Sequence, residues 1–127
     1  MNKDIFPIGI GGWGIGGFAK KDASNDEKDV EALVYSLSKG MNFIEVNYWN
    51  SEGHNVELLA EAIDKSGVGR EKLFFNQAVY NYRNETLEDI AEEMKVVREI
   101  LGTDYMDSVE FSLSGVLQYG FDNVVEF

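Results

Sequence analysis

Side chains that can carry out chemistry gather between residues 42 and 55. This segment contains a carboxylate, two aromatic rings and an imidazole, at Glu45, Tyr48, Trp49 and His54. A carboxylate at the end of a buried strand is costly unless it has a partner, so Glu45 is the acid whose place most suggests a function. We expect backbone amides or Tyr48 to be that partner. The segment is therefore the first candidate site, and the alternative is that Tyr48 and Trp49 only pack over the end of the fold.

Composition excludes several other chemistries. The chain has no cysteine, and His54 is its only histidine, which excludes a thiolate or histidine-rich metal site. No Ser-His-Asp set can be assembled around one histidine without a nucleophile elbow. We therefore predict no metal site, and Glu110, inside another predicted strand, is the second acid that needs a partner.

A glycine-rich stretch, residues 9–14, fits the G-x-G-x-x-G pattern of dinucleotide-binding folds. In those folds the loop runs directly into a helix whose N-terminus holds the pyrophosphate. Here no helical pattern begins until after Asn25. A glycine-rich loop at the end of a strand is the favoured interpretation, and a nucleotide-binding module is the weakest alternative.

Alternating strands and helices must position these residues. Short apolar runs predict strands over residues 5–10, 42–46, 73–79 and 105–111. Apolar stripes at helical spacing predict a helix after each of the first three strands, and a further helix is expected near Asn123. The alternation indicates an α/β fold of parallel βα units. A complete (β/α)8 TIM-type barrel takes about 250 residues, so we expect half of one.

Length and charge limit the organisation and the partners. With 127 residues, the chain is expected to form a single domain, 1–127. Its formal net charge of −12 argues against nucleic acid and against an anionic membrane surface. No apolar run approaches the roughly 18 residues of a membrane span, and the first residues lack a signal sequence. We expect a cytoplasmic protein.

The sequence also resembles a known family over five successive segments, residues 6–14, 32–44, 53–63, 70–75 and 101–107. Residues 6–14 resemble the opening strand of aldo-keto reductases, and residues 32–44 resemble their first helix and second strand. Residues 53–63 resemble the next loop and helix. Residues 70–75 and 101–107 resemble the approaches to the third and fourth strands. The resemblance covers almost the whole chain. It implies a half-barrel domain from a (β/α)8 family of NADP(H)-dependent carbonyl reductases.

The resemblance also implies where catalytic residues would stand. The family uses a Tyr that donates a proton, a Lys supported by an Asp that lowers the pKa of the Tyr, and a His that orients the substrate. The Asp, Tyr, Lys and His positions correspond to Glu45, Asn50, Ala78 and Ser112. Asn50 cannot donate an acidic proton, and Ala78 cannot perturb a pKa. A rescue by Tyr48 needs a rebuilt loop, because Tyr48 lies two residues before Asn50.

We therefore expect a degenerate, non-catalytic relative that acts as a binding or assembly module. Its ligand-pocket candidates are Trp13, Glu45, Tyr48, Trp49 and His54. No cofactor is expected for the isolated chain, because the resemblance implies that the second half of the barrel holds most of NADP(H).

Two alternatives stay open. One is an NADP(H)-dependent oxidoreductase completed by dimerisation or by a second chain, with a site rebuilt around Glu45, Tyr48 and Trp49. The other is a relic with no selected activity. Because half a barrel exposes two sheet edges, we predict a homo-oligomer or a complex with a second half-barrel chain, unless the tail after Ser112 folds across the open side.

Overall fold

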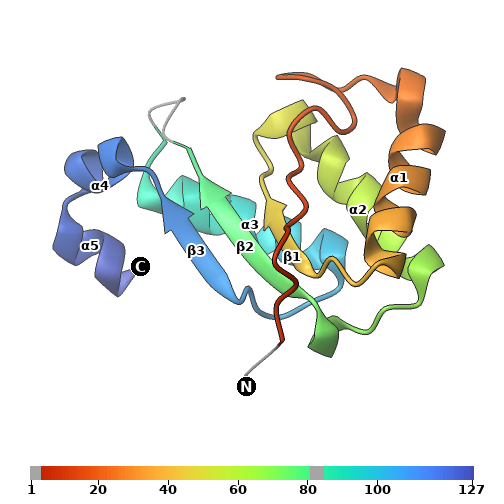
Figure 1. The fold of residues 1–127 in the computed structure, drawn as a ribbon. Helices are drawn as coiled ribbons and strands as arrows, with labels where there is room; N and C mark the ends of the chain where they lie inside the picture. The colour runs from red at the N-terminus through yellow and green to blue at the C-terminus, as the bar shows by residue number, and fades with distance from the viewer. Residues whose placement is uncertain (1–3, 81–84) are drawn as a thin grey trace.

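A computed structural model describes residues 4–80 and 85–127 (Figure 1). Strands and helices alternate along the chain, as α1 (Asp26–Ser38), β1 (Phe43–Val46), α2 (His54–Ser66), β2 (Phe74–Val79), α3 (Leu87–Leu101) and β3 (Ser108–Phe111), followed by α4 (Leu113–Tyr119) and α5 (Phe121–Glu126). Three 3-10 turns, η1 (Ala23–Asn25), η2 (Asn50–Gly53) and η3 (Arg70–Lys72), lie in the connections. The predicted α/β fold of βα units is confirmed.

The three strands form one parallel sheet in the order β1-β2-β3. The register pairs Glu45 with Asn76, and Asn76 with Ser108. Paired residues of a parallel sheet point to the same face, so these three side chains form a row across the sheet. The carboxyl ends of the strands therefore meet at one edge, where the candidate site lies.

The prediction of a strand over residues 5–10 is wrong. Only Ile10 pairs with the sheet, through a single parallel bridge to Ile44. The Ile10 amide donates to the Phe43 carbonyl at 2.8 Å, and the Ile10 carbonyl accepts from the Glu45 amide at 2.9 Å. Residues 5–9 make no further ladder with β1, so the segment runs beside β1 without becoming a strand.

The fourth predicted strand, residues 105–111, is shorter and begins at Ser108. Arg70 holds the preceding residues in a turn, because its guanidinium donates to the Tyr105 carbonyl at 3.0 Å and to Asp107 at 2.8 Å. Asp107 also accepts from the Phe75 amide at 2.9 Å. These bonds occupy the Tyr105 carbonyl and the Asp107 carboxylate in the turn that precedes β3.

Helix boundaries follow the sequence signals closely. A capping box starts α3, in which the Thr86 hydroxyl accepts from the Asp89 amide and the Asp89 carboxylate accepts from the Thr86 amide. Gly102 ends α3 with a left-handed φ of 62°. The second helix begins at His54.

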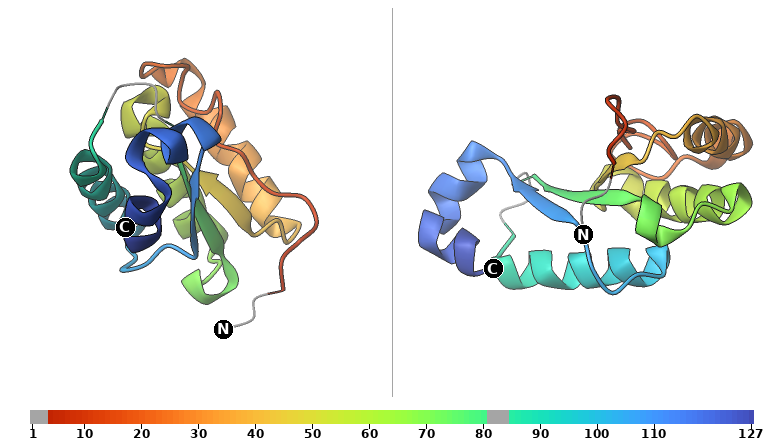
Figure 2. Two further views of the ribbon diagram at one scale, coloured as in Figure 1. Left: turned by 90° about the vertical axis from the view of Figure 1, so that its left-hand side faces the viewer. Right: turned by 60° about the horizontal axis from the view of Figure 1, so that its bottom comes forward.

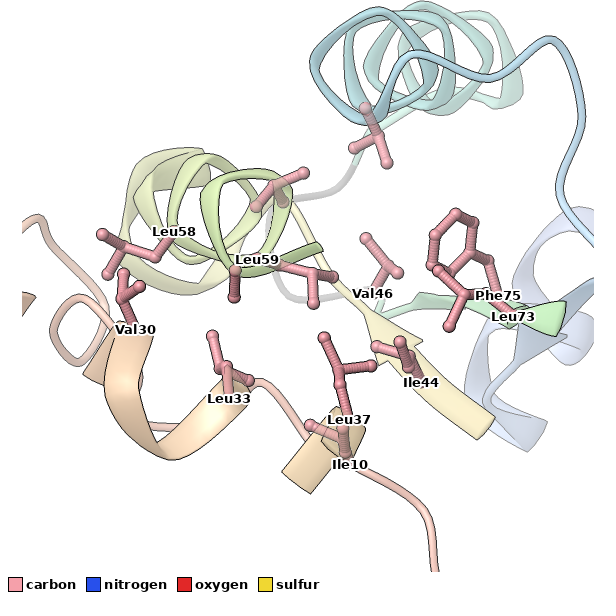
Figure 3. Close-up of a cluster of buried hydrophobic side chains, with 13 residues drawn as sticks. Ile10, Val30, Leu33, Leu37, Ile44, Val46, Leu58, Leu59, Leu73 and Phe75 are labelled. Carbon is pink, nitrogen blue, oxygen red and sulfur yellow. The ribbon is translucent and has the colours of Figure 1, made fainter. Parts of the chain in front are cut away.

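The main hydrophobic core lies between the sheet and the helices (Figure 3). Ile44, Val46 and Phe75 point from the sheet into this core, and each is 1% exposed. Ile10 joins them from the N-terminal segment. These four side chains line the helix-facing side of the sheet, because side chains alternate between the two faces of a strand.

The helix expected near Asn123 is α5, which begins at Phe121, and another short helix, α4, precedes it. They lie beyond the β3 edge of the sheet (Figure 2) and contact it through Phe111, whose ring packs edge-on against Tyr119 and Phe127. Tyr119 donates to the Glu85 carbonyl at 2.8 Å. The tail therefore packs toward the start of α3 and does not fold across the open side.

The sheet face opposite the core is not covered by any helix of the described chain (Figure 2). Phe43 and Phe74 stack on this open face with ring centroids 5.2 Å apart. By the register, Glu45, Asn76 and Ser108 share it. In a closed barrel this face would be the interior.

Candidate functional site

Glu45 lies half-buried on the open face, one residue before β1 ends. The Tyr80 hydroxyl donates to its Oε1 atom at 3.2 Å. Tyr80, just past the end of β2, is therefore the side-chain partner that Glu45 needs, in place of the expected Tyr48. Sequence reasoning missed Tyr80, although its even spacing from Asn76 and Ala78 along β2 gave a signal that it shares their face.

A polar row continues from Glu45 across the open face. The Ser108 hydroxyl donates to Asn76 Oδ1 at 2.6 Å, and Asn76 Nδ2 donates to Glu110 Oε2 at 3.0 Å. Glu110 thereby has the partner that its position in a strand demanded. Asn76 is 6% exposed and was also missed, since the two adjacent amides Asn76 and Gln77 in an apolar run carry little sequence signal.

Asn50, at the position that corresponds to the proton donor, is 1% exposed. Its Nδ2 donates to the Gly12 carbonyl at 2.9 Å, and its backbone amide donates to Asn47 Oδ1 at 3.0 Å. Its Oδ1 atom has no hydrogen-bond partner among the described residues. Asn50 thus ties the glycine-rich loop to the loop after β1.

The other two corresponding positions also have structural roles. Ala78 is 3% exposed in β2, and its carbonyl accepts from Asn47 Nδ2 at 3.4 Å. Ser112 caps α4, because its hydroxyl accepts from the Gly115 amide at 3.1 Å. Neither side chain supplies a cation or an imidazole at the edge where the strands end.

The ligand-pocket candidates separate into two groups in space. Trp13 and Trp49 lie together with ring centroids 6.0 Å apart, and Phe18 meets Trp13 edge-on at 5.1 Å. Trp13 and Phe18 are 53% and 61% exposed. Tyr48 instead packs its ring on Gly53, whose φ of 85° and lack of a side chain leave room for it.

His54 lies away from these rings, and its buried imidazole is paired with two more exposed carboxylates. Its Nδ1 atom lies 2.7 Å from Glu57 Oε2, and its Nε2 atom lies 2.9 Å from both carboxylate oxygens of Asp26. Burial lowers the pKa of His54, but the bonds to Glu57 and Asp26 outweigh burial and raise that pKa above its ordinary value. The cluster joins the first turns of α1 and α2.

His54 also supports the glycine-rich loop. A side chain at Gly16 would lie 2.9 Å from the imidazole, and the Gly16 amide donates to Asp29 at 2.9 Å. The loop that contains Trp13 and Phe18 therefore contacts the start of α1 and His54 through Gly16.

The glycine-rich loop does not have the geometry of a dinucleotide-binding loop. After the glycine-rich loop, no α-helix starts until Asp26, and its first turn carries the acids Asp26, Glu27 and Asp29. Carboxylates there would repel a pyrophosphate. This loop therefore does not suit the pyrophosphate of NADP(H).

Within residues 4–80 and 85–127, no group of three or more acidic or imidazole side chains is arranged to hold a metal ion. The helices of this same part of the chain are all too short or too polar to cross a membrane.

Residues 7–113 match the model of the Aldo/keto reductase family. This chain belongs to that family. The match extends from the N-terminal segment to the start of α4, so the family resemblance read from the sequence is confirmed over most of the chain. No curated protein is significantly similar to this aldo/keto reductase relative.

Solved aldo-keto reductases share its fold. A thermostable aldo-keto reductase in complex with the inhibitor epalrestat is 29% identical, with a TM-score of 0.78 over 99% of this chain and 46% of that one. The enzyme from Brucella melitensis is 24% identical, with a TM-score of 0.64 over 93% and 42% of the two chains. The enzyme from Klebsiella pneumoniae in complex with NADPH is 21% identical, with a TM-score of 0.65 over 96% and 42%. The chain therefore spans less than half the length of these relatives.

Proposed function

We propose that this chain is a degenerate aldo/keto reductase relative that binds or assembles with a partner and does not reduce carbonyls. The observation that carries this proposal is that the Asn50 side chain is buried and hydrogen-bonded to the backbone. An amide that is 1% exposed and bonded to the Gly12 carbonyl cannot hand a proton to a substrate. Ala78 and Ser112 supply neither an ammonium nor an imidazole in place of the Lys and the His.

The binding role is supported by the exposed aromatic cluster, which we define as Trp13, Phe18 and Trp49. Its rings lie at the edge where the strands end, the edge that carries active sites in (β/α)8 barrels. The cluster offers flat apolar rings, which suit a flat or apolar ligand.

One observation favours the alternative, an NADP(H)-dependent oxidoreductase completed by dimerisation or by a second chain. The Tyr80 phenol lies 3.2 Å from Glu45, so a phenol and a carboxylate stand together on the open face. Such a pair could serve as a general acid once the barrel is complete. In that case NADP(H) would supply the hydride, and the missing half would hold it.

The deciding experiment measures NADPH oxidation by the purified chain with a panel of aldehydes and quinones. We expect no turnover above a heat-inactivated control, because losing general acid–base help costs roughly 10²–10⁴ in rate. Turnover that is proportional to protein would overturn the proposal. The variant Tyr80→Phe then serves as the matched control, since a loss of that turnover would assign the acid to Tyr80 and support the alternative.

A further inference from the structure

The loop that carries two of the exposed aromatic rings rests against the buried histidine. We call residues 11–22, between the bridge at Ile10 and the turn η1, the Trp13 loop. The Gly16 amide of this loop donates to Asp29 in α1 at 2.9 Å. A Cβ atom at Gly16 would lie 2.9 Å from the His54 imidazole, so the backbone of the loop contacts that ring. The Trp13 loop therefore lies across the starts of α1 and α2 (Figure 1).

The end of the Trp13 loop has a second attachment to the same region. The Lys21 ammonium donates to Glu57 Oε2 at 3.4 Å, and the Lys21 amide donates to Glu52 Oε2 at 3.4 Å. The same Glu57 oxygen lies 2.7 Å from His54 Nδ1. The loop and the two helices therefore share one set of charged groups.

The Trp13 loop depends on these attachments for its conformation. Ala19 has a φ of 59° and Gly17 a φ of 118°, both in the left-handed region that most residues avoid. Such conformations persist where the surrounding structure holds them. A change in the contacts with α1 and α2 therefore changes the position of the loop and of Trp13.

The contacts depend in turn on the charge of His54. Its Nδ1 atom faces Glu57 and its Nε2 atom faces Asp26. An imidazolium has two N–H donors, whereas a neutral imidazole has one. Only the imidazolium donates to both carboxylates, so loss of the proton leaves one carboxylate opposite a lone pair. Glu57 is the partner that turns into solvent, since its side chain is 54% exposed and both Asp26 oxygens lie 2.9 Å from Nε2.

Charged groups surround the imidazole from each element packed near it. These groups are Asp26 and Asp29 of α1, Glu52 of η2, Glu57 of α2 and Lys21 of the Trp13 loop. Four of these five are acids, which favour the charged form of His54. The position of His54 as the first residue of α2 opposes that charge, because the N-terminal end of a helix favours anions. The carboxylates therefore supply what keeps His54 protonated.

We propose that protonated His54 positions the Trp13 loop, so that the aromatic cluster is assembled while His54 carries its proton and loosens when the proton is lost. This inference rests on the binding role proposed above and names how that site is regulated. Without the positive charge between them, Asp26 and Glu57 repel each other, and the starts of α1 and α2 lose their link. The Trp13 loop is attached to both starts, so Trp13 then moves away from Trp49, which belongs to another segment.

The composition of the chain makes the test specific. His54 is the only histidine, and Trp13 and Trp49 are the only two tryptophans. The imidazole signal in proton NMR therefore reports the charge of His54, and quenching of tryptophan fluorescence by acrylamide reports the exposure of the aromatic cluster. We expect quenching to increase as the pH rises, with the midpoint of the NMR titration, above the ordinary pKa of about 6.5. Constant quenching between about pH 6 and pH 9, or a different midpoint, would overturn the inference.

The variant His54→Gln removes the titrating group. We expect its tryptophan quenching to be independent of pH while circular dichroism shows a folded protein. Glu92→Gln is the control, because Glu92 pairs with Lys95 within α3, and it should keep the midpoint of the wild type. Quenching that still follows pH in His54→Gln would show that another group controls the loop.

The variant Asp29→Ala separates positioning of the loop from titration of His54. It removes the acceptor of the Gly16 amide and leaves the imidazole with both of its carboxylates. We expect the NMR signal of His54 to titrate while quenching is high at every pH. Glu31→Ala removes an exposed acid from the same helix and should behave as the wild type. Quenching in Asp29→Ala that matches the wild type would overturn the inference, whether or not His54→Gln folds.

A flat, uncharged probe, N-phenyl-1-naphthylamine, tests the consequence for binding. We expect tighter binding to the wild type at pH 6 than at pH 9, and equal affinity at both values for His54→Gln. Because coupling between two binding events is reciprocal, saturating probe should raise the NMR midpoint of His54. Equal affinity of the wild type at both pH values would overturn the regulation of binding. If the probe binds at neither pH while the NMR and fluorescence midpoints coincide, the proposed binding role fails and the positioning role of His54 stands.

Discussion

The ion-pair cluster around His54 gives a prediction that separates a structural histidine from a ligand-binding one. The substitution His54→Gln keeps a hydrogen-bonding side chain but removes the titrating imidazole. His54 contacts Glu57 at 2.7 Å and Asp26 at 2.9 Å, and its side chain is 7% exposed. The variant therefore removes two charge-assisted contacts that join α1 to α2.

The magnitude follows from the burial of the partners. A hydrogen bond to a charged group contributes about 1.5–3 kcal/mol. The Glu57 side chain is 54% exposed, so solvent reduces its contact to the range of about 0.2–1 kcal/mol seen for exposed pairs. The Asp26 side chain is 31% exposed and retains more of its contact. We expect His54→Gln to lower the free energy of unfolding by about 1–3 kcal/mol near pH 6.

The effect should depend on pH in a defined direction. The pKa of His54 is raised on folding, so its stabilising contribution is fully present below its unfolded value of about 6.5. That contribution is lost as the pH rises through the raised pKa. The bond from His54 lowers the pKa of Glu57, so the contribution of Glu57 is lost as the pH falls through its lowered pKa. The difference between wild type and variant should be largest between these two limits.

Urea denaturation of both proteins between pH 5 and 9 measures this difference. As a control, Glu92→Gln removes an exposed ion pair with Lys95, 3.2 Å long, and should change stability by less than about 1 kcal/mol at every pH. A stability difference between wild type and His54→Gln that stays constant or grows from pH 6 to pH 9 would refute the reasoning. So would a loss of binding by a small aromatic probe without any loss of stability, because His54 would then act as a ligand contact.

Two further substitutions test the contacts of the site. Tyr80→Phe should lower the free energy of unfolding by about 0.5–1.5 kcal/mol through the lost bond to Glu45, whereas Tyr80→Phe and Glu45→Gln combined should cost less than the sum of the single changes; additive costs would show that the pair is not coupled. Asn50→Ala should cost about 1–3 kcal/mol because it leaves the Gly12 carbonyl without its donor, and an unchanged urea midpoint would show that this carbonyl is satisfied by water.

The sequence by itself determined the local elements and the family. The apolar stripes from Val30 to Leu37 and from Leu87 to Leu101 predicted helices that the structure confirms. A period of 3.6 residues puts the apolar side chains on one face of a helix, which then packs against the core. The replacements at Asn50, Ala78 and Ser112 were also legible in the sequence, since their positions follow from the family pattern.

Tertiary structure alone decided which groups meet. The segment from Ile5 to Ile10 has the composition of a strand, but only Ile10 pairs with β1, through a single bridge to Ile44. Tyr80 became the partner of Glu45 because parallel pairing brings the ends of β1 and β2 together, although 35 residues separate the two in sequence. Spacing along the chain favoured Tyr48 as the partner of Glu45, but the Tyr48 ring packs on Gly53 instead. Long-range register, rather than local pattern, therefore set the contacts of the candidate site.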